Sequence, residues 1–326
     1  MEPSMWSTLP EITRLSPLVW RVMGGNPGKF TLQGTNTYLI GRGTSRILID
    51  TGDGIPTWLS LLRKHLHESP PSDFGLTPGQ PRPEVTKVIL THRHHDHVNG
   101  VADLLTLFPR AQIFKYRSES HPTLGEDQGW KVTRYLQDGE VFQVEEGVKL
   151  KVVYTPGHTD DHVCLHLTSS DGEENGLFTG DNVLGHGTSV FENLRLYMDS
   201  LAKMKAVGAR KGYPGHGEVL ENVGSTISDY IKHREIREQQ IVRALKGAHV
   251  QFQGRNGNGS GGTTVAELTD TVYGELPMEI KSAAMRGIGL VVQKLVEEGR
   301  VAEAEGKGGE MGWKLVGGLG SGEERL

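Results

Sequence analysis

Four side chains that could bind a metal lie within six consecutive positions of the segment THRHHDHVNG at residues 91–100. They are His92, His94, Asp96 and His97. Imidazoles crowded this closely repel one another when protonated, and polar groups lose hydration when they are buried. A bound cation would relieve both costs. The spacing therefore predicts a metal site directly after the apolar run VTKVIL.

Three more segments end in the same way. LKVVYTPGH ends at His158, GLFTGD ends at Asp181, and GYPGH ends at His216. Each is a strand-like run that finishes in turn residues and a potential ligand, so we expect all four loops to converge at one edge of a sheet. The only cysteine, Cys164, cannot build a thiolate site, so nitrogen and oxygen must hold any metal.

Neutral imidazole and carboxylate are suitable ligands for zinc or a similar divalent ion. Seven such side chains exceed the need of one tetrahedral ion and suffice for two ions about 3.5–4 Å apart. Such ions lower the pKa of bound water from about 15.7 to about 7 and polarise a carbonyl or phosphoryl oxygen. The mixture of acidic ligands and glycines favours an open catalytic site over a closed structural one.

Strand-like and helical segments alternate along the first 250 residues, which predicts an α/β fold with a mixed sheet. A proline-rich stretch at 68–83 is expected to be a surface insertion that packs no core. A helix is predicted over about 225–246, from apolar residues that recur at three and four positions. We predict a catalytic domain at 1–250 on this basis.

The C-terminal part is predicted to be a separate small module. The segment GRNGNGSGG indicates a flexible glycine-rich linker, assigned to 251–262. A helix near 265–273, a second helix with an apolar face up to Leu295, and a hairpin from RVAEAE to GWKLV follow it. This order predicts a winged-helix-like module at 263–326, which could pack on the enzyme or form a homodimer.

Composition excludes some classes of function. The net charge is −5 and the pI is about 6.3, which argues against a general field that attracts nucleic acid. No apolar run approaches the roughly 18 residues that span a bilayer, so no membrane partner is expected. The first residues, MEPSMWSTLPEITRLS, show neither a secretory signal nor a typical transit peptide. We therefore expect a cytoplasmic protein.

The ligand pattern resembles that of the metallo-β-lactamase superfamily. The resemblance implies an αββα sandwich with two zinc ions and the activity of a metal-dependent hydrolase. It implies that one ion is held by His92, His94 and His158, and the other by Asp96, His97 and His216, with Asp181 bridging the two. It also gives Asp96 a second, catalytic role as the group that accepts and returns a proton.

Longer segments resemble two branches of that superfamily: NPGKFTLQGTNTYLIG at 26–41, TPGHTDDH at 155–162 and TGDNVLGHGTSVFENL at 179–194. One branch is the fungal lactamase-like thioesterases, which release a chain from the acyl carrier protein domain of a non-reducing polyketide synthase in secondary metabolism, sometimes with Claisen-type cyclisation. The other is the mitochondrial lactamase-like endoribonuclease, which cuts single-stranded RNA.

The first branch is favoured mainly on the segments NPGKFTLQGTNTYLIG and DNVLGHGTS. Charge adds a smaller argument, because the segment from Ile231 onward balances 13 Lys and Arg against 13 Asp and Glu. Such a surface offers little attraction for RNA. A third hypothesis, a non-catalytic binding protein on a hydrolase scaffold, would require a missing ligand, and none is missing.

Several other side chains near the ligands have weaker assignments. His186 could orient a ligand or contact substrate, but a plain loop histidine is the commoner case. Asp160, Asp161 and His162 could support the ligands or be capping and solvated residues. Arg93 and His95 occupy the variable positions of the motif and are expected to point away from the ions.

Overall fold

The computed structural model describes residues 7–126, 128–256 and 261–316. The chain forms two compact units. The first comprises Met1–Glu192 with Leu196–Tyr230, and the second Asn193–Arg195 with Ile231–Leu326. The division falls earlier in the chain than the predicted domain end at residue 250.

The first unit contains two sheets. The larger has the order β1-β2-β3-β4-β5-β6-β7, and the smaller has the order β12-β11-β10-β9-β8. In the larger sheet β1 to β4 pair antiparallel and β4 to β7 pair parallel. The smaller sheet is antiparallel except for the β11–β12 pair.

The strands of the larger sheet are β1 (Ile12–Arg14), β2 (Val19–Met23), β3 (Asn36–Ile40), β4 (Ser45–Ile49), β5 (Glu84–Leu90), β6 (Gln112–Lys115) and β7 (Arg134–Tyr135). Those of the smaller sheet are β8 (Val141–Glu145), β9 (Val148–Tyr154), β10 (Val163–Ser169), β11 (Asn175–Gly180) and β12 (Lys211–Pro214).

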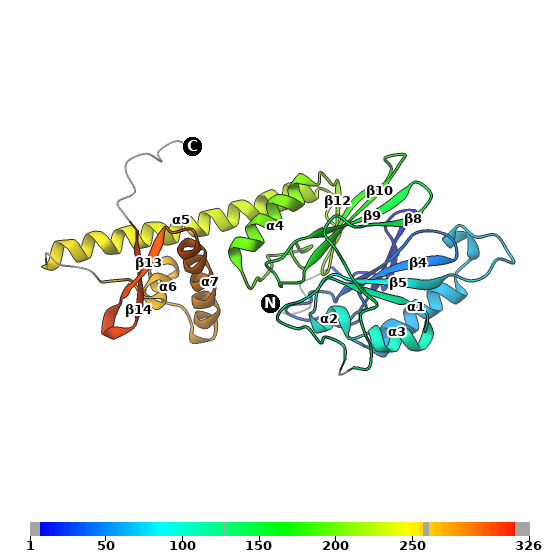
Figure 1. Ribbon diagram of the computed structural model, residues 1–326, viewed down its shortest axis with the longest axis horizontal. Coiled ribbons are helices and arrows are strands. Elements are labelled where there is room, and N and C mark those ends of the chain that lie inside the picture. Colours follow the sequence, from blue (N-terminus) through cyan, green and yellow to red (C-terminus); the bar gives the residue numbers. More distant parts are fainter. Residues whose placement is uncertain (1–6, 127, 257–260, 317–326) are drawn as a thin grey trace. The chain divides into compact units, whose positions relative to one another are not determined.

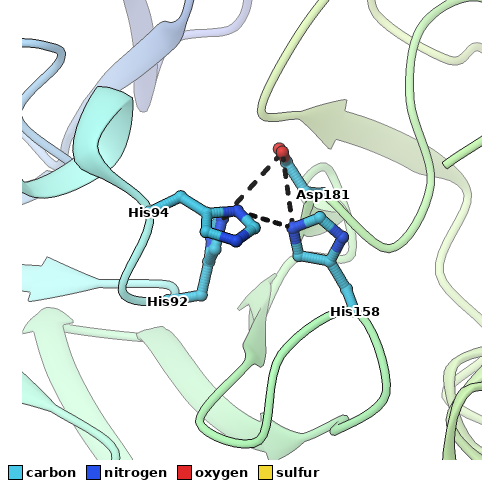
Figure 2. Close-up of side chains that lie close together, drawn as sticks. All are labelled: His92, His94, His158 and Asp181. Carbon is cyan, nitrogen blue, oxygen red and sulfur yellow. Dashed lines mark hydrogen bonds and ion pairs between the residues drawn. The ribbon is translucent and has the colours of Figure 1, made fainter. Parts of the chain in front are cut away.

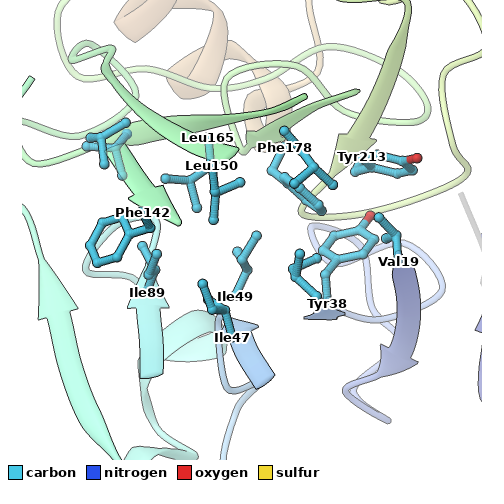
Figure 3. Packing of buried hydrophobic residues seen from close by; sticks show 14 of the residues in the cluster. Val19, Tyr38, Ile47, Ile49, Ile89, Phe142, Leu150, Leu165, Phe178 and Tyr213 are labelled. Atoms are coloured by element: carbon cyan, nitrogen blue, oxygen red, sulfur yellow. The ribbon is translucent and has the colours of Figure 1, made fainter. Parts of the chain in front are cut away.

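Alternation along the strands separates two cores. Side chains on a strand point to opposite faces in turn, so Ile47 and Ile49 of β4 enter the core between the sheets while Leu48 enters the core on the outer face. The inner core joins both sheets, and Figure 3 shows Ile89 of the larger sheet near Leu165 of the smaller. Burial of each large apolar side chain contributes about 1.5–3 kcal/mol, which holds the sheets face to face.

Helices cover the outer faces of both sheets (Figure 1). Helices α1 (Pro56–Glu68) and α3 (Val101–Leu107) bury Leu62 and Leu104 against the larger sheet. Helix α4 (Leu194–Ala206) lies along the smaller sheet, where Ser200 donates a hydrogen bond to the carbonyl of Pro156 at 2.7 Å. A single turn, α2 (His95–Val98), follows β5. The layers confirm the predicted αββα sandwich.

The proline-rich stretch at 68–83 does more than the composition suggested. It contains a short 3-10 turn (Pro71–Phe74), and the side chain of Phe74 is fully buried in the outer core beside Trp20 and His65. The expectation of a passive insertion was therefore wrong at this residue. Leu76 of the same stretch is buried in this core as well, so two apolar side chains anchor a loop whose composition predicted none.

The second unit is a small helical module with a hairpin. Helix α6 (Val265–Tyr273) begins with a capping box, in which Thr264 accepts from the backbone of Glu267 and the Glu267 carboxylate accepts from the backbone of Thr264. Helix α7 (Met278–Glu297) and strands β13 (Val301–Glu305) and β14 (Met311–Leu315) follow, with a 3-10 turn (Lys307–Gly309) between the strands. The predicted order of two helices and a hairpin is confirmed.

Helix α5 (Val223–Asn256) is longer than predicted. It includes residues 251–256, so the predicted linker at 251–262 was wrong over that part, and positions 257–260 lie outside the described residues. Glycine lowers helix stability by about 1 kcal/mol but does not forbid a helix. None of the helices in the described residues is long and apolar enough to cross a membrane.

The packing of His65 predicts a measurable acid sensitivity. Burial lowers the pKa of His65 to about 4, and its ring lies 4.4 Å from that of Trp20. Because protonation is easier in the unfolded chain, this side chain supports the fold above about pH 6.5 and loses that contribution as pH falls. We expect the stability advantage of the native protein over His65→Gln to shrink by about 2 kcal/mol between pH 7 and pH 5. Denaturant unfolding of both proteins measures this, and parallel pH curves would contradict it.

Candidate metal centre

The predicted ligands meet at one end of the sandwich, where strands from both sheets finish. The ligand cluster at 92–97 follows β5 of the larger sheet. His158, Asp181 and His216 follow β9, β11 and β12 of the smaller sheet. The predicted convergence is therefore present, but the edge belongs to two sheets and not to one.

The first ligand group consists of His92, His94, His158 and Asp181 (Figure 2). The Nδ1 atom of His94 lies 3.0 Å from the Nε2 atoms of both His92 and His158. The Oδ2 atom of Asp181 lies 3.9 Å from Nε2 of His92 and 3.7 Å from Nε2 of His158. Three ring nitrogens and a carboxylate oxygen thus face a common point.

The second ligand group consists of Asp96, His97 and His216. The Nε2 atom of His216 lies 3.1 Å from Oδ2 of Asp96, and Nε2 of His97 lies 3.4 Å from the same oxygen. Asp181 also reaches this group, with Oδ2 3.3 Å from His216 and Oδ1 3.4 Å from His97. The carboxylate of Asp181 therefore lies between the two groups, where a bridging ligand would be.

Hydrogen bonds on the far side of the rings orient these histidines. The Nδ1–H of His158 donates to the carbonyl of Val190 at 2.8 Å, and the Nδ1–H of His92 donates to the hydroxyl of Thr91 at 3.0 Å. A ring whose Nδ1 carries the proton presents a lone pair on Nε2. Both Nε2 atoms that face the first group are thus prepared to bind a cation.

Asp50 organises both groups, although no role was predicted for it from the sequence. Its Oδ2 atom accepts from Nδ1–H of His97 at 2.8 Å and from the Thr91 hydroxyl at 2.8 Å, and Oδ1 accepts from the Thr91 backbone at 2.8 Å. Asp50 is 2% exposed and has a left-handed backbone with φ 59°. Its position directly after the strand SRILI, like that of Asp181 directly after β11, was the signal that could have identified it.

His162 supports Asp181 and lies outside the two candidate ligand groups. Its Nε2 atom accepts from the backbone N–H of Asp181 at 3.1 Å, and its Nδ1–H donates to the hydroxyl of Thr155 at 3.0 Å. Gly180 must be glycine here, because its φ is +48° and a Cβ atom would lie 2.5 Å from the His162 ring. Gly215 approaches equally closely, since a Cβ atom there would lie 2.3 Å from Oδ1 of Asp181.

The charge state of the first group suits a metal. Burial and then the neighbouring His158 lower the pKa of His94 to about 4, and burial also lowers the pKa values of His92 and His158. These rings are neutral at pH 7, as metal ligands must be. Their converging lone pairs cannot all hydrogen bond to one another, so the cluster is able to bind metal ions.

The second group pairs an ionised carboxylate with imidazoles that hold protons. Burial opposes ionisation of Asp96, but His97 and the hydrogen bond from His216 hold the pKa of its carboxyl below the usual value. Burial likewise opposes protonation of His216, yet Asp181 and Asp96 raise its pKa to about 9. Buried carboxylates demand compensating positive charge, and a divalent ion can replace the protons on these rings.

A cleft of about 450 Å³ opens over the cluster. Its floor includes His94, Asp96 and His158, and its walls come from residues 29–32 and 184–190. The exposed side chains of Phe30 and Val190, 74% and 62% exposed, belong to these walls. A metal centre with an open side and apolar walls suits a catalytic site that admits an organic substrate.

The structure also places the side chains that had weaker assignments. Arg93 points away as predicted, pairing with Glu192 at 2.6 Å, and His95 is exposed. Asp160 accepts hydrogen bonds from Ser118 and from the backbone of Glu119 and Ser120, and Asp161 is buried in an ion pair with Lys115. His186 lies on the wall of the cleft.

Asp50→Asn is predicted to weaken metal binding while the protein stays folded. Asparagine tolerates the left-handed backbone and can still accept from Thr91, but it removes the charge that holds His97. We expect native protein to bind two ions per chain and the variant to lose affinity by about 10–100-fold, mainly at the second group. Titration of zinc into metal-free protein measures both steps. Asp53→Asn is the matched control, and equal affinities of native protein and Asp50→Asn would refute the role.

Comparisons with known proteins agree with this geometry. The sequence profile of the Metallo-beta-lactamase superfamily matches residues 30–216, and that of the Beta-lactamase associated winged helix domain matches residues 264–313. The chain is 43% identical over 295 residues to lactamase-like protein nscB of Arthroderma gypseum, covering 90% of this chain and 86% of that protein. It is 40% identical over 310 residues to lactamase-like protein adaB of Aspergillus niger, covering 95% and 89%.

Solved structures share the fold at lower identity. A beta-lactamase domain protein from Burkholderia ambifaria aligns with a TM-score of 0.69 and 19% identity, covering 95% of this chain and 96% of that one. A metallo-beta-lactamase family protein from Thermus thermophilus aligns with a TM-score of 0.64 and 22% identity, covering 93% and 100%. With its sandwich, its two ligand groups and these relatives, the chain belongs to the metallo-beta-lactamase superfamily, with an associated winged-helix domain at its C-terminal end.

Proposed function

We propose that this protein is a zinc-dependent thioesterase that releases a polyketide chain from the acyl carrier protein of a non-reducing polyketide synthase. The observation that carries the proposal is the cleft, in which the ligand cluster forms the floor and largely uncharged side chains form the walls. The identity of 40–43% with fungal lactamase-like proteins over nearly the whole chain supports the same branch of the superfamily.

The proposal includes named ligands for each ion. One zinc would be held by His92, His94 and His158, and a second by Asp96, His97 and His216, with Asp181 shared between them. When bound, divalent ions supply Lewis acidity toward the substrate carbonyl and make water easier to deprotonate.

Asp96 is the group of this chain that can move a proton. It is 22% exposed at its side chain, lines the cleft, and is held by the hydroxyl of Thr35 at 3.1 Å. Because its pKa is lowered, the carboxylate is ionised and can accept a proton from the water that attacks the thioester carbonyl. The C–S bond then breaks, and the same proton can pass to the departing thiolate.

The walls of the cleft fit an acyl chain better than a nucleic-acid strand. Among the described residues that line it, Lys29 is the sole Lys or Arg. A strand of RNA needs several cations along its phosphates and aromatic platforms for its bases. Leu32, Leu184 and Val190 instead provide apolar contact along the walls.

The preferred substrate is predicted to be an acyl thioester. A thioester carbonyl is electrophilic and its thiolate leaves easily, whereas a phosphodiester needs its anionic strand held in place. We expect a carrier-bound polyketide, or its small thioester mimic, to be cleaved faster than unstructured RNA at the same salt concentration. His94→Ala should abolish the activity, and His95→Ala, which alters an exposed neighbour, should retain it. RNA cleavage that depends on His94, without thioester cleavage, would establish the nuclease alternative.

Asp96→Asn is predicted to keep the fold and lose turnover. The amide cannot accept a proton and is a weaker ligand, so kcat should fall by about 10²–10⁴-fold, as expected for the loss of an acid–base group. Steady-state kinetics with zinc content measured on the same sample separates the chemical loss from loss of metal. Asp103→Asn, on the exposed face of α3, is the matched control, and near-normal turnover of Asp96→Asn would remove Asp96 from the mechanism.

A further inference from the structure

One wall of the cleft contains a short turn that carries the exposed imidazole of His186. The backbone of the other three residues of this turn is held by hydrogen bonds or close packing. This turn is residues 184–187, with His186 near its tip, and His186 lines the cleft. The hydroxyl of Tyr230 accepts from the backbone N–H of Leu184 at 3.1 Å and donates to the carbonyl of Gly187 at 2.9 Å. One buried phenol thus joins the two ends of the turn.

The middle of the turn is tied directly to the metal centre. The backbone N–H of Gly185 donates to the carbonyl of His216 at 2.9 Å. Gly185 packs so closely that a Cβ atom would lie 2.3 Å from both the backbone nitrogen and oxygen of Glu218. Gly187 has a φ of +72°, which other residues rarely adopt. Hydrogen bonds therefore hold the backbone on both sides of His186, and one of them connects it to a predicted ligand.

A second polar group lies on the other wall. Lys29 lines the cleft, and its Nζ atom lies 5.7 Å from the centre of the Phe30 ring. The loop that carries both is closed by the backbone hydrogen bond from Gly28 to Leu32 at 3.0 Å, and Leu32 has the unusual φ of 54°. Strained backbone of this kind is commonly found at functional sites.

We propose that His186 is a specificity-determining residue that hydrogen bonds to oxygen substituents on the acyl group, with Tyr230 as the residue that positions it. The inference rests on the proposed thioesterase function. Apolar walls with an imidazole on one and an ammonium on the other suit an apolar acyl group that bears hydroxyl or carbonyl oxygens. An acyl group that lacks such oxygens would offer these polar side chains no hydrogen-bond partner on the substrate.

The experiment compares two acyl groups of the same skeleton on the metal-loaded full-length protein. One is a 2,4-dihydroxybenzoyl thioester of N-acetylcysteamine, and the other is the benzoyl thioester, which lacks the hydroxyls. The selectivity is the ratio of their kcat/KM values. The dissociation constants of the matching amides, which resist cleavage, give the same comparison without turnover.

We expect native protein to prefer the hydroxylated substrate, and His186→Ala to reduce that selectivity by about 3–10-fold through KM, the effect of one hydrogen bond. Tyr230→Phe removes only the hydroxyl that clamps the turn and should reduce the selectivity in the same direction. His67→Ala, an exposed histidine on α1 outside the cleft, is the matched control and should match native protein.

Other outcomes would overturn the inference. An equal loss for both substrates in His186→Ala would show a structural role, and unchanged selectivity in both kinetics and amide binding would show no contact. If native protein cleaves both thioesters but the preference is independent of His186, only the inference is wrong. If native protein cleaves neither thioester, the proposed function is wrong. The dissociation constants of the amides then decide alone whether His186 binds the hydroxyl groups.

Discussion

The metal centre depends on one buried carboxylate, that of Asp50. It accepts three hydrogen bonds of 2.8 Å, two from Thr91 and one from His97. Through the Thr91 hydroxyl it also fixes His92, so a ligand from each group takes its orientation from the same side chain. A buried anion costs several kcal/mol unless it is compensated, and here cations in the centre would supply the compensation. Metal binding and folding are thereby coupled, because the buried negative charge of Asp50, which orients the ligands, is stabilised by cations bound in the centre.

The seven candidate ligands could be selected from the sequence because their signal is local and chemical. Four of them lie within six positions, and the other three each follow an apolar run, so residue type and strand end together were sufficient. Asp50 ends a strand in the same manner but stands alone, and an isolated Asp-Thr-Gly is typical of any turn. What it contacts is decided by the pairing of β4 with β5, which places residue 50 beside Thr91. The local sequence does not predict the register in which distant strands pair.

The errors in the fold have the same physical origin. Composition predicted that the proline-rich stretch at 68–83 would stay outside the core and that residues 251–256 would be a linker. Two apolar side chains overcame the first expectation, because burial of Phe74 and Leu76 offsets the ordering of a few loop residues. In α5 the helix continues through glycine, since each added turn propagates an existing helix and does not need a new nucleus. Composition averages over residues, whereas stability depends on particular contacts.

The arrangement separates the chemistry from the recognition of substrate. The ligands follow strands that are held by the inner core, so their positions depend on the packing of two sheets and change little with the surface. The walls of the cleft are instead loops, 29–32 and 184–190. The second loop is held by hydrogen bonds of its backbone to the Tyr230 hydroxyl and to the carbonyl of His216. Loops of this kind can exchange side chains without moving a ligand. A superfamily with one metal centre can therefore act on different substrates, and in this chain the residues that decide the substrate should be sought on those two walls, where His186 and Lys29 lie.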